Sequence, residues 1–548
     1  MEELISLVFK EDLPSIEEIY KKYPDRGFTN SQKVTRVGPS PTGCVHIGTL
    51  YASLICERLA HTTNGVFFLR IEDTDTKREV QGVDKKIPAL LKQYHINFDE
   101  GYNEDGTEVG NYGPYKQSER EKIYKAFIKE LLKEGKAYPC FCTEEELESI
   151  VKQQKAQNCQ RLGYYGNWAK YRNFPIEEAI KKIKNGEDYV IRFKSDGNFT
   201  KKVAINDCLK GIVEFPESDL DVVILKKNNL PTYHLAHVVD DHLMGTNPVI
   251  RGDEWLPSVP LHLQLFKALG WKAPQYAHIS PILKIDETGS KRKLSKRKDP
   301  EANVEYFDEL GYPVESIVEY LMNLANSNFE DWRKQNPTKP YTEFPFSLKK
   351  MNTSGALFDF VKLNSVSKEV IGLMKAERIY DLALIWAKKY NQKLFDLLQN
   401  NKEKSIAILN IERENVKKVR KDIAKWSDLE NELVYFFELD SNKIKELLRN
   451  YDNNDLKQLV EFMKQNYDIN DTNDEWFNKI KTISEKLNYA TNIKEYKANP
   501  NNFKGSVSDM AKFLRIMITG KEQSPNLYEI MKILGHDESL KRLKNACF

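Results

Sequence analysis

A short loop near the start of the chain carries residues that could bind a phosphate group. The segment PSPTGCVHIGTL (39–50) places prolines, glycines and His46 directly after a short apolar run. Backbone N–H groups and the dipole at the start of a helix favour a bound anion, and an imidazole there can donate a hydrogen bond to a phosphate oxygen. Gly48 lets a ligand approach the backbone closely. By itself, a bare His-Ile-Gly segment is more often a turn with a surface histidine.

A second loop, far along the chain, offers positive charge. The segment KRKLSKRK (291–298) follows Gly289, so we expect a mobile loop. Lys293 and Lys296 could neutralise the charge that develops on a transferring phosphoryl group. By itself, this segment is only a lysine-rich surface loop, because most basic clusters are solvated or bind nucleic acid loosely. Whether the two loops form one site depends on the elements that position them.

The pattern around the first loop predicts a β-α-β unit. Residues 33–38 (KVTRVG) predict a strand, residues 49–65 predict a helix, and residues 66–73 (VFFLRIED) predict a second, buried strand. The loop with His46 therefore connects the first strand to the helix. In parallel sheets this carboxyl edge is where ligands bind.

Later segments predict a second half of the same fold after an insertion. Residues 118–135 have helical spacing, with a capping-box pattern at Ser118 and Glu121. Between about residues 138 and 220 the pattern is mixed, which we interpret as the insertion, and beyond residue 300 glycines thin out and helical patterns run to the end. The other predicted elements are strands at 189–194, 221–227, 248–252 and 275–280 and a helix at 257–269.

Taken together, the two loops resemble the paired signatures of class I aminoacyl-tRNA synthetases. The HIGT segment at the first strand and the KLSKR segment (293–297) after the last strand match those signatures in order, spacing and context. In that family the two loops clasp ATP from opposite sides of a Rossmann-type site. The resemblance implies an α/β Rossmann-type catalytic domain with an inserted α+β domain, followed by an all-α C-terminal anticodon-binding region.

Longer segments narrow the resemblance to the glutamyl-tRNA synthetases of the bacterial type. The similarity is specific from about residue 33 to residue 300 and continues weakly to the C-terminus, where LRIMITG (514–520) is also similar to the family. The specific segments are TRVGPSPTGCVHIGT (35–49), LRIEDTD (69–75), GPYKQSER (113–120), PTYHLAHVVDDHLMG (231–245) and VIRGDEWLPS (249–258).

The resemblance also implies a division of the chain into six parts. These are an N-terminal helical extension (1–32), the first half of the catalytic Rossmann fold (33–115), an inserted acceptor-binding domain (116–227), the second half with the KLSKR loop (228–300), a helical stem-contact domain (301–378) and an all-helical anticodon-binding domain (379–548).

Glutamate as the substrate agrees with the charged residues in these segments. The two carboxylates and the amine of glutamate need fixed cations and a fixed anion in the protein. Arg36 and Arg251 are candidates to bind the carboxylates, and Glu72 can bind the ammonium. An arginine that contacts the side chain favours glutamate over neutral glutamine, which leaves that charge unpaired. Each residue alone is also explained as part of a structural ion pair. The resemblance implies a glutamate pocket of Arg36, Gly38, Ser40, Glu72, Tyr233, His237 and Arg251, with His237 where many family members have asparagine.

The resemblance implies a two-step reaction with ATP. The glutamate carboxylate attacks the α-phosphorus in line, giving glutamyl-adenylate and pyrophosphate, and the terminal adenosine hydroxyl of tRNA(Glu) then attacks the acyl carbon. Positioning and charge stabilisation carry such catalysis, Mg²⁺ normally accompanies the ATP, and family members generally need bound tRNA before they activate glutamate. We expect His46, Lys293 and Lys296 to be catalytic. The implied ATP-binding residues are Pro41, Thr42, Gly43, His46, Gly48, Thr49, Glu254, Trp255, Leu294, Ser295, Lys296 and Arg297.

A pair of cysteines in the predicted insertion raises the question of a metal. Some family members bind Zn²⁺ with a C-x-C pair and a later tyrosine and cysteine, and this chain has Cys140 and Cys142. A tetrahedral site needs four ligands. Residues 163–173 supply tyrosines but no cysteine, and Cys159 comes too early. We therefore expect a degenerate site without metal.

Composition sets the remaining limits. The 548 residues, 40% apolar and 30% charged, predict a soluble protein of several domains. A net charge of +2 neither favours nor excludes a nucleic-acid partner, because local basic patches suffice. No apolar run reaches the roughly 18 residues of a membrane span, the N-terminus lacks a signal core, and seven cysteines make no disulfide framework. We expect a monomer in the reducing cytoplasm.

The helical tail and the choice of tRNA leave alternatives open. KKVRK (417–421) could contact phosphates or be a solvated helix face. Where strictly discriminating family members carry an anticodon-reading arginine, this chain has Val434, which suggests an enzyme that also charges tRNA(Gln). Other interpretations are a paralogue that glutamylates a modified tRNA base, a nucleotidyltransferase that does not use tRNA, and a tRNA-binding scaffold. The first two classes are shorter, and a scaffold does not need both ATP loops.

Overall fold

A parallel sheet in two halves forms the centre of the first of two compact units. The structure, a computed structural model, describes residues 1–414 and 416–546 and divides into one unit of 1–306 with 318–359 and another of 307–317 with 360–546. In the first half, β1 (Val34–Val37), β2 (Val66–Leu69) and β3 (Glu100–Tyr102) run parallel, and β4 (Glu108–Val109) is antiparallel to β3. In the second half, β10 (Val249–Gly252) and β11 (Tyr276–Ile279) run parallel.

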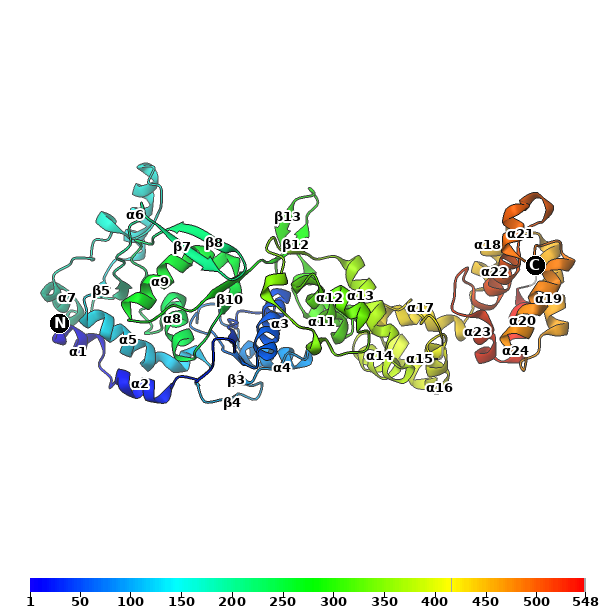
Figure 1. Cartoon of the computed structure of the whole chain (residues 1–548), viewed down its shortest axis with the longest axis horizontal. Coiled ribbons are helices and arrows are strands. Elements are labelled where there is room, and N and C mark those ends of the chain that lie inside the picture. The colour runs from blue at the N-terminus through cyan, green and yellow to red at the C-terminus, as the bar shows by residue number, and fades with distance from the viewer. Residues whose placement is uncertain (415, 547–548) are drawn as a thin grey trace. The chain divides into compact units, whose positions relative to one another are not determined.

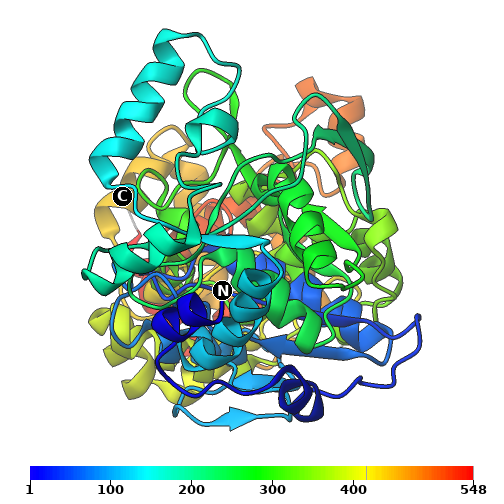
Figure 2. The same ribbon diagram turned by 90° about the vertical axis from the view of Figure 1, so that its left-hand side faces the viewer.

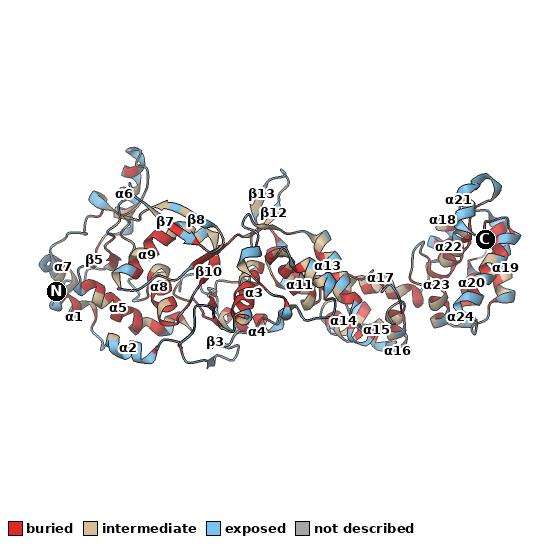
Figure 3. Ribbon diagram, in the orientation of Figure 1, coloured by how far each residue is buried: buried red, intermediate tan, exposed pale blue. Residues whose placement is uncertain are grey.

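The two halves meet beside β1. The backbones of Val34, the first residue of β1, and Asn247, just before β10, exchange two hydrogen bonds of 3.2 and 2.8 Å. Helix α3 (Ile47–Thr62) packs on β1, β2 and β10, and Figure 3 shows β10 and most of α3 as buried. The carboxyl ends of β1, β2 and β10 therefore open on one side, as the predicted Rossmann-type arrangement requires.

The inserted segment contains a three-stranded antiparallel sheet and a separate hairpin. The sheet consists of β5 (Ala137–Cys140), β6 (Val190–Phe193) and β9 (Val223–Leu225), and helix α6 (Glu144–Ala156) stands out at the upper left of Figure 2. The hairpin pairs β7 (Lys202–Asp207) with β8 (Gly211–Pro216). Its Ile205 packs against buried residues of β10 and β11, so the hairpin is fixed to the second half of the parallel sheet.

Two local predictions are wrong. Ser118 and Glu121 form no capping box, because a 3-10 turn (Gln117–Arg120) precedes α5 (Glu121–Lys133) and the Ser118 hydroxyl donates instead to Asp73 at 2.6 Å. The KLSKR segment does not follow the last strand. Lys293 ends β13 (Lys291–Lys293), which pairs antiparallel with β12 (Ile282–Ile285), and β12 also pairs with β14 (Ala356–Leu357). The strands of this exposed hairpin were not predicted because its lysine-rich sequence lacks the alternation of apolar and polar residues.

The second unit is helical and has its own core. Helix α14 shows why, because its Ile379, Ala383 and Trp386 recur on one face and are all buried in that core. Figure 1 shows the helices of this unit in yellow-green to red. They are α13 (Phe360–Gly372), α14 (Ala376–Tyr390), α15 (Gln392–Asn400), α16 (Lys402–Asn410), α17 (Leu429–Leu433), α18 (Ser441–Leu448), α19 (Asn453–Asn466), α20 (Asn473–Lys486), α21 (Ile493–Ala498), α22 (Val507–Thr519), α23 (Leu527–Leu534) and α24 (His536–Asn545).

The N-terminal arm is helical, as predicted, and lies across the first unit. Arg26 donates two hydrogen bonds of 2.8 Å to Glu100 and one of 2.7 Å to the Met244 carbonyl. The remaining helices of the first unit are α1 (Glu2–Val8), α2 (Ile16–Lys22), α4 (Val83–Gln93), α7 (Ile176–Lys184), α8 (Tyr233–Leu243), α9 (Val259–Ala268) and α12 (Phe329–Gln335). Helices α10 (Glu305–Leu310) and α11 (Val314–Ala325) each include residues assigned to both units. Among the described residues, no helix has the length and apolar character needed to span a membrane.

Candidate active site

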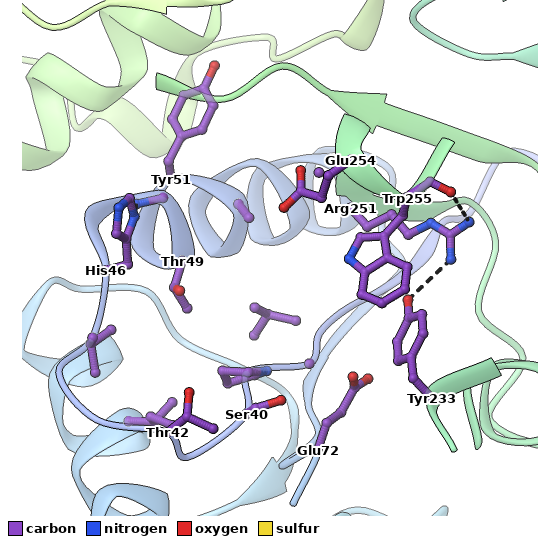
Figure 4. A pocket seen from close by; sticks show the side chains of 18 of the residues that line it. Ser40, Thr42, His46, Thr49, Tyr51, Glu72, Tyr233, Arg251, Glu254 and Trp255 are labelled. Atoms are coloured by element: carbon purple, nitrogen blue, oxygen red, sulfur yellow. Dashed lines mark hydrogen bonds between the residues drawn. The ribbon is translucent and has the colours of Figure 1, made fainter. Parts of the chain in front are cut away.

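A cavity of about 820 Å³ opens at the carboxyl ends of β1, β2 and β10 (Figure 4). Residues more than 200 positions apart in the chain share its wall, so the two loops predicted to act together do form one site. The predicted residues that line it are Arg36, Gly38, Ser40, Thr42, Gly43, His46, Gly48, Thr49, Glu72, Tyr233, Arg251, Glu254, Trp255, Lys293, Leu294 and Lys296.

His46 is fixed by the helix that it precedes. It is the N-cap of α3, and its Nδ1 accepts a hydrogen bond of 2.8 Å from the Gly48 N–H. A Cβ atom on Gly48 would lie 2.9 Å from that Nδ1, so this contact requires glycine. Burial and the neighbouring Lys296 lower the pKa of His46, which favours the neutral ring. With Nδ1 as acceptor, the proton sits on Nε2, and the backbone carbonyl of Leu294 also hydrogen-bonds the ring, so a ligand oxygen would take the place of that carbonyl.

The lysines of the second loop contact the first loop and the opposite wall. Lys296 Nζ donates a hydrogen bond of 2.6 Å to the Cys44 carbonyl, and Lys293 Nζ lies 3.0 Å from Glu254 Oε1. Asp299 secures the loop by accepting from the Arg292 guanidinium at 2.6 and 2.7 Å and from the Ser295 N–H at 2.9 Å. The hydrogen bond from Arg292 also holds the pKa of Asp299 below its ordinary value. Two cations therefore stand beside the helix N-terminus, where an anion binds.

Arg36 and Glu72 belong to a buried network of charges. Burial opposes the charge of Arg36, but Asp241, 3.1 Å from its Nε, holds the pKa of the guanidinium above its ordinary value. Burial likewise acts to raise the pKa of Asp241, and Arg36 and Arg70 hold it well below. Burial raises the pKa of Glu72, although Arg70 donates to its Oε1 at 2.8 Å. Burial leaves the Glu72 carboxylate poorly solvated, so a ligand cation beside it would add to the stabilisation that Arg70 gives.

Gly38 is needed where the first strand passes this network. A Cβ atom there would lie 2.2 Å from Glu72 Oε1. Any side chain would push the carboxylate out of its position at the cavity wall. The glycine therefore serves the placement of Glu72 and leaves the cavity open above it.

Arg251 differs from Arg36 because uncharged groups hold it. Its Nε donates to His278 Nε2 at 3.0 Å, its Nη1 donates to the Tyr233 hydroxyl at 3.1 Å, and its Nη2 lies 3.2 Å from His262 Nδ1 and 3.5 Å from the Trp255 carbonyl. In the part of the chain that the structure describes, no carboxylate pairs with it. The side chain is 6% exposed, at the cavity wall (Figure 4). A buried, uncompensated guanidinium is a strong site for a ligand carboxylate.

His237 does not lie at the cavity edge, which corrects the prediction for this residue. It is fully buried, and its ring stacks behind that of Tyr233 with centroids 5.5 Å apart. Its Nδ1 lies 2.6 Å from Asp241 and its Nε2 lies 3.2 Å from the Tyr276 hydroxyl, so both nitrogens already have partners. His237 supports Tyr233 and Asp241 and does not contact a ligand in the cavity.

Three predicted ATP-binding residues also lie off the cavity wall. Pro41 is buried and its carbonyl accepts from the Val80 N–H, while the Ser295 backbone is engaged with Asp299 and Arg297 is exposed. Sequence reasoning missed several residues of the wall, because single polar residues of this kind carry no pattern. They are Tyr51, Thr74, Asp75, Arg78, Lys226 and Ser280.

The cysteine pair of the insertion surrounds a tyrosine hydroxyl. Cys140 Sγ and Cys142 Sγ each lie 3.5 Å from the Tyr164 hydroxyl. A hydrogen bond from Cys142 is the main cause that lowers the pKa of Cys140 to about 5, and the same bond raises the pKa of Cys142. Within the described residues, no group of three or more His, Cys, Asp or Glu side chains could hold a metal ion.

The basic segment of the second unit is only partly available to a partner. Lys417 and Lys418 are exposed, whereas Arg420 is buried and pairs with Asp422 at 2.6 Å and with Glu432 at 3.1 Å. Val434 begins a 3-10 turn (Val434–Phe436) in the same unit. Lys421 is also exposed but pairs with Glu369, so Lys417 and Lys418 are the stronger candidates for phosphate contacts.

We expect acid to destabilise the first unit through its buried histidines. Burial lowers the pKa of His234 from 6.5 to about 4 and that of His237 to about 3. Below pH 6.5 the unfolded chain binds protons that the folded chain does not, so the free energy of unfolding falls as the pH falls. Between about pH 7 and about pH 5, each of these histidines lowers the free energy of unfolding by about 2 kcal/mol.

Urea unfolding at the two pH values measures this loss. Between about pH 7 and about pH 5, the free energy of unfolding is expected to fall by about 2 kcal/mol less in His237→Asn than in the parent. His95→Asn, which removes an exposed imidazole from the same unit, is the control. Its free energy of unfolding is expected to fall by the same amount as that of the parent. An equal loss in His237→Asn and in the parent would show that His237 is not kept neutral.

Comparison with known proteins gives the family. The family model for the catalytic domain of class I tRNA synthetases (E and Q) matches residues 32–339, and an anticodon binding domain model matches residues 378–547. A glutamate–tRNA ligase of Clostridium perfringens is 48% identical over 547 residues, which cover 99% of each chain. The chain belongs to the glutamate–tRNA ligase family. The cavity described above lies within the part of the chain that the catalytic-domain model matches.

Other glutamate–tRNA ligases are similar to this chain over almost its whole length. The glutamate–tRNA ligase of Acetivibrio thermocellus is 47% identical over 522 residues and covers 95% of each chain. Among solved structures, a glutamate tRNA ligase from Elizabethkingia meningosepticum in complex with its amino acid has a TM-score of 0.72 at 27% identity, covering 94% of this chain and 99% of that one. The predicted fold class and family are thus confirmed.

Proposed function

We propose that the chain attaches L-glutamate to the 3′ end of tRNA(Glu) through glutamyl-adenylate, as a class I aminoacyl-tRNA synthetase that uses ATP. The observation that carries the choice of glutamate is the uncompensated charge of Arg251 in the cavity wall. A glutamate side-chain carboxylate supplies the missing anion, whereas the neutral amide of glutamine leaves the buried charge unpaired. Glu72 receives the ammonium, and Tyr233 and Ser40 add hydrogen bonds.

The arrangement assigns the first step to positioning and charge. His46 Nε2–H and the helix N-terminus bind phosphate oxygens, and Arg36 holds the glutamate so that its α-carboxylate attacks the α-phosphorus in line. Pyrophosphate leaves with the electron pair of the broken P–O bond. Lys296 leaves the Cys44 carbonyl to bind the charge that develops on the phosphates, and Lys293 adds a second cation. Glu254 and Trp255 border the place of the adenosine.

The second step needs no protein nucleophile. The terminal ribose hydroxyl of the tRNA attacks the acyl carbon of glutamyl-adenylate, and AMP leaves. We infer that Mg²⁺ enters with ATP, because the described residues do not gather the carboxylates of a protein-held Mg²⁺ site, and phosphate oxygens and water meet its preference for oxygen ligands. The cysteine pair is proposed to work without zinc, since Tyr164 already satisfies both thiols.

We propose the following roles for the parts that hold the tRNA. Residues 1–32 brace the catalytic fold (33–115 and 228–300). Residues 116–227 bind the acceptor end, residues 301–378 contact the stem, and residues 379–548 bind the anticodon, with 415 and 547–548 lying outside the described part. One chain supplies the whole cavity wall, so a monomer suffices. The described cysteines are free, which suits the reducing cytoplasm.

Charging of purified tRNA with labelled glutamate tests this function. Transcripts of tRNA(Glu) and tRNA(Gln) are compared, because the position of Val434 supports charging of both. Label on tRNA(Glu) alone keeps the main proposal and rejects the wider specificity. Label on neither transcript contradicts both. Label attached to native tRNA that lacks its 3′-terminal adenosine would instead indicate the paralogue that glutamylates a modified tRNA base.

A further inference from the structure

We propose that Asp207 and His278 are positioning residues that hold Arg251 in the orientation that binds the substrate carboxylate. The inference rests on the proposed function, in which Arg251 contacts glutamate. It adds two residues that lie behind the cavity wall, one of them on the inserted hairpin. Neither residue lines the cavity, so neither is a catalytic residue.

The three side chains form a continuous buried chain of hydrogen bonds. Arg251 Nε donates to His278 Nε2 at 3.0 Å, and His278 Nδ1 lies 2.6 Å from Asp207 Oδ2. Asp207 is 2% exposed and His278 is not exposed at all. Because water cannot replace these contacts, the guanidinium plane is fixed by the imidazole, and the imidazole is fixed by the carboxylate.

The protons in this chain can be placed from the donors alone. A guanidinium has only N–H donors, so His278 Nε2 must carry a lone pair and the single ring proton sits on Nδ1. That proton is donated to Asp207, which selects this tautomer. His278 is therefore a neutral acceptor, and burial, the main cause, lowers its pKa as this role requires. The carboxylate of Asp207 acts through the ring and leaves the charge of Arg251 available to a ligand.

Asp207 is itself held by the turn of the β7–β8 hairpin. Its Oδ1 accepts from the N–H groups of Leu209 and Lys210, both at 2.9 Å, and its Oδ2 also accepts from the His278 N–H at 3.1 Å. Lys210 Nζ then donates to Ser280 Oγ and to the Thr353 carbonyl, so the turn is fastened at the edge of the cavity. The orientation of Arg251 therefore depends on a hairpin that belongs to the insertion.

A second neutral imidazole completes the support. Arg251 Nη2 lies 3.2 Å from His262 Nδ1, and His262 Nε2 lies 3.0 Å from His234 Nδ1. Burial, the main cause, lowers the pKa of His262, so its Nδ1 also serves as an acceptor. A carboxylate at the position of His278 or His262 would pair with Arg251 and compete with the substrate. Two uncharged acceptors orient the guanidinium without that competition.

Asp207→Asn is the decisive variant because it keeps the shape of the side chain. If the amide oxygen retains the two hydrogen bonds from the turn, the amide NH₂ faces His278 Nδ1 and cannot accept its proton. His278 must then carry its proton on Nε2, where it opposes the Arg251 N–H, as wrong-tautomer variants of buried Asp–His pairs do. We expect the KM for glutamate in ATP–pyrophosphate exchange with tRNA present to rise roughly 10- to 100-fold, the range for supporting residues of this kind. The KM for ATP stays near that of the parent, whereas the melting temperature falls, because the amide NH₂ also faces the His278 N–H that Oδ2 accepts in the parent.

The control is Glu214→Gln, which removes an exposed carboxylate from the same hairpin. An unchanged KM for glutamate in Asp207→Asn overturns the inference while the proposed function stands. A parent enzyme without glutamate-dependent exchange overturns the function instead. If Asp207→Asn does not fold, His278→Gln and His278→Leu decide. The amide oxygen of glutamine can still accept from Arg251, so we expect the leucine variant to have the higher KM for glutamate, and equal values reject the inference.

Discussion

Arg251→Gln lowers kcat/KM for glutamate by about 10²- to 10³-fold, which corresponds to the roughly 3 to 4 kcal/mol expected when one member of a buried charge pair is lost. The Arg251 side chain is 6% exposed and its partners are uncharged, so the substrate carboxylate is the group that compensates it. The KM for ATP changes little, because Arg251 lies away from the two phosphate-binding loops. Steady-state ATP–pyrophosphate exchange with tRNA present measures both values.

The same variant tests how glutamate is distinguished from glutamine. Without the positive charge, the ratio of kcat/KM for glutamate to that for glutamine falls, because the preference depended on pairing a carboxylate. Arg333→Gln is the matched control, since Arg333 pairs with Glu319 in the same unit and does not line the cavity. Retention of kcat/KM and of the ratio in Arg251→Gln would show that another residue binds the side chain.

Lys296→Ala lowers kcat by about 10²- to 10³-fold and leaves the KM for glutamate near that of the parent. Among the described residues, the Cys44 carbonyl is the acceptor that holds its Nζ, and Lys296 can leave this acceptor when phosphate oxygens arrive. The charge of Lys296 therefore acts mainly in the transition state, which lowers kcat when it is removed. Lys293→Ala has a smaller effect, because Glu254 already neutralises part of that charge.

Single-turnover formation of glutamyl-adenylate separates this effect from product release. Lys298→Ala is the control, because it removes an exposed lysine of the same loop that does not line the cavity. A loss in Lys298→Ala as large as that in Lys296→Ala would mean that only the net charge of the loop matters. A raised KM for glutamate with an unchanged kcat in Lys296→Ala would move its role to ground-state binding.

The sequence predicted the loops and strands at the site because these have strong local signals. The turn around His46 and Gly48 carries glycines, prolines and a helix start, and the apolar runs of β1, β2 and β10 are those of buried parallel strands. The order of these elements then places both loops at one edge of a sheet. The family resemblance supplied the pairing of the loops, which spacing alone does not give.

The supporting residues were not predictable, because their roles depend on partners far away in the chain. Asp207 meets His278 across 71 positions, and Arg36 meets Asp241 across 205. His237 was assigned to the cavity from its position in a familiar segment. The helix turns that side chain inward, where Asp241 and Tyr276 take both ring nitrogens. Burial and tautomer are properties of the folded packing and leave no periodic pattern in the sequence.

ATP–pyrophosphate exchange with glutamate or glutamine, each with and without tRNA, tests the central claim most directly. The claim is that one cavity holds a dicarboxylate amino acid at Arg251 beside ATP between His46 and Lys296. We predict exchange with glutamate when tRNA is present, little without tRNA, and little with glutamine in either case. Exchange that glutamine supports as well as glutamate, or no exchange with glutamate and tRNA together, would contradict it.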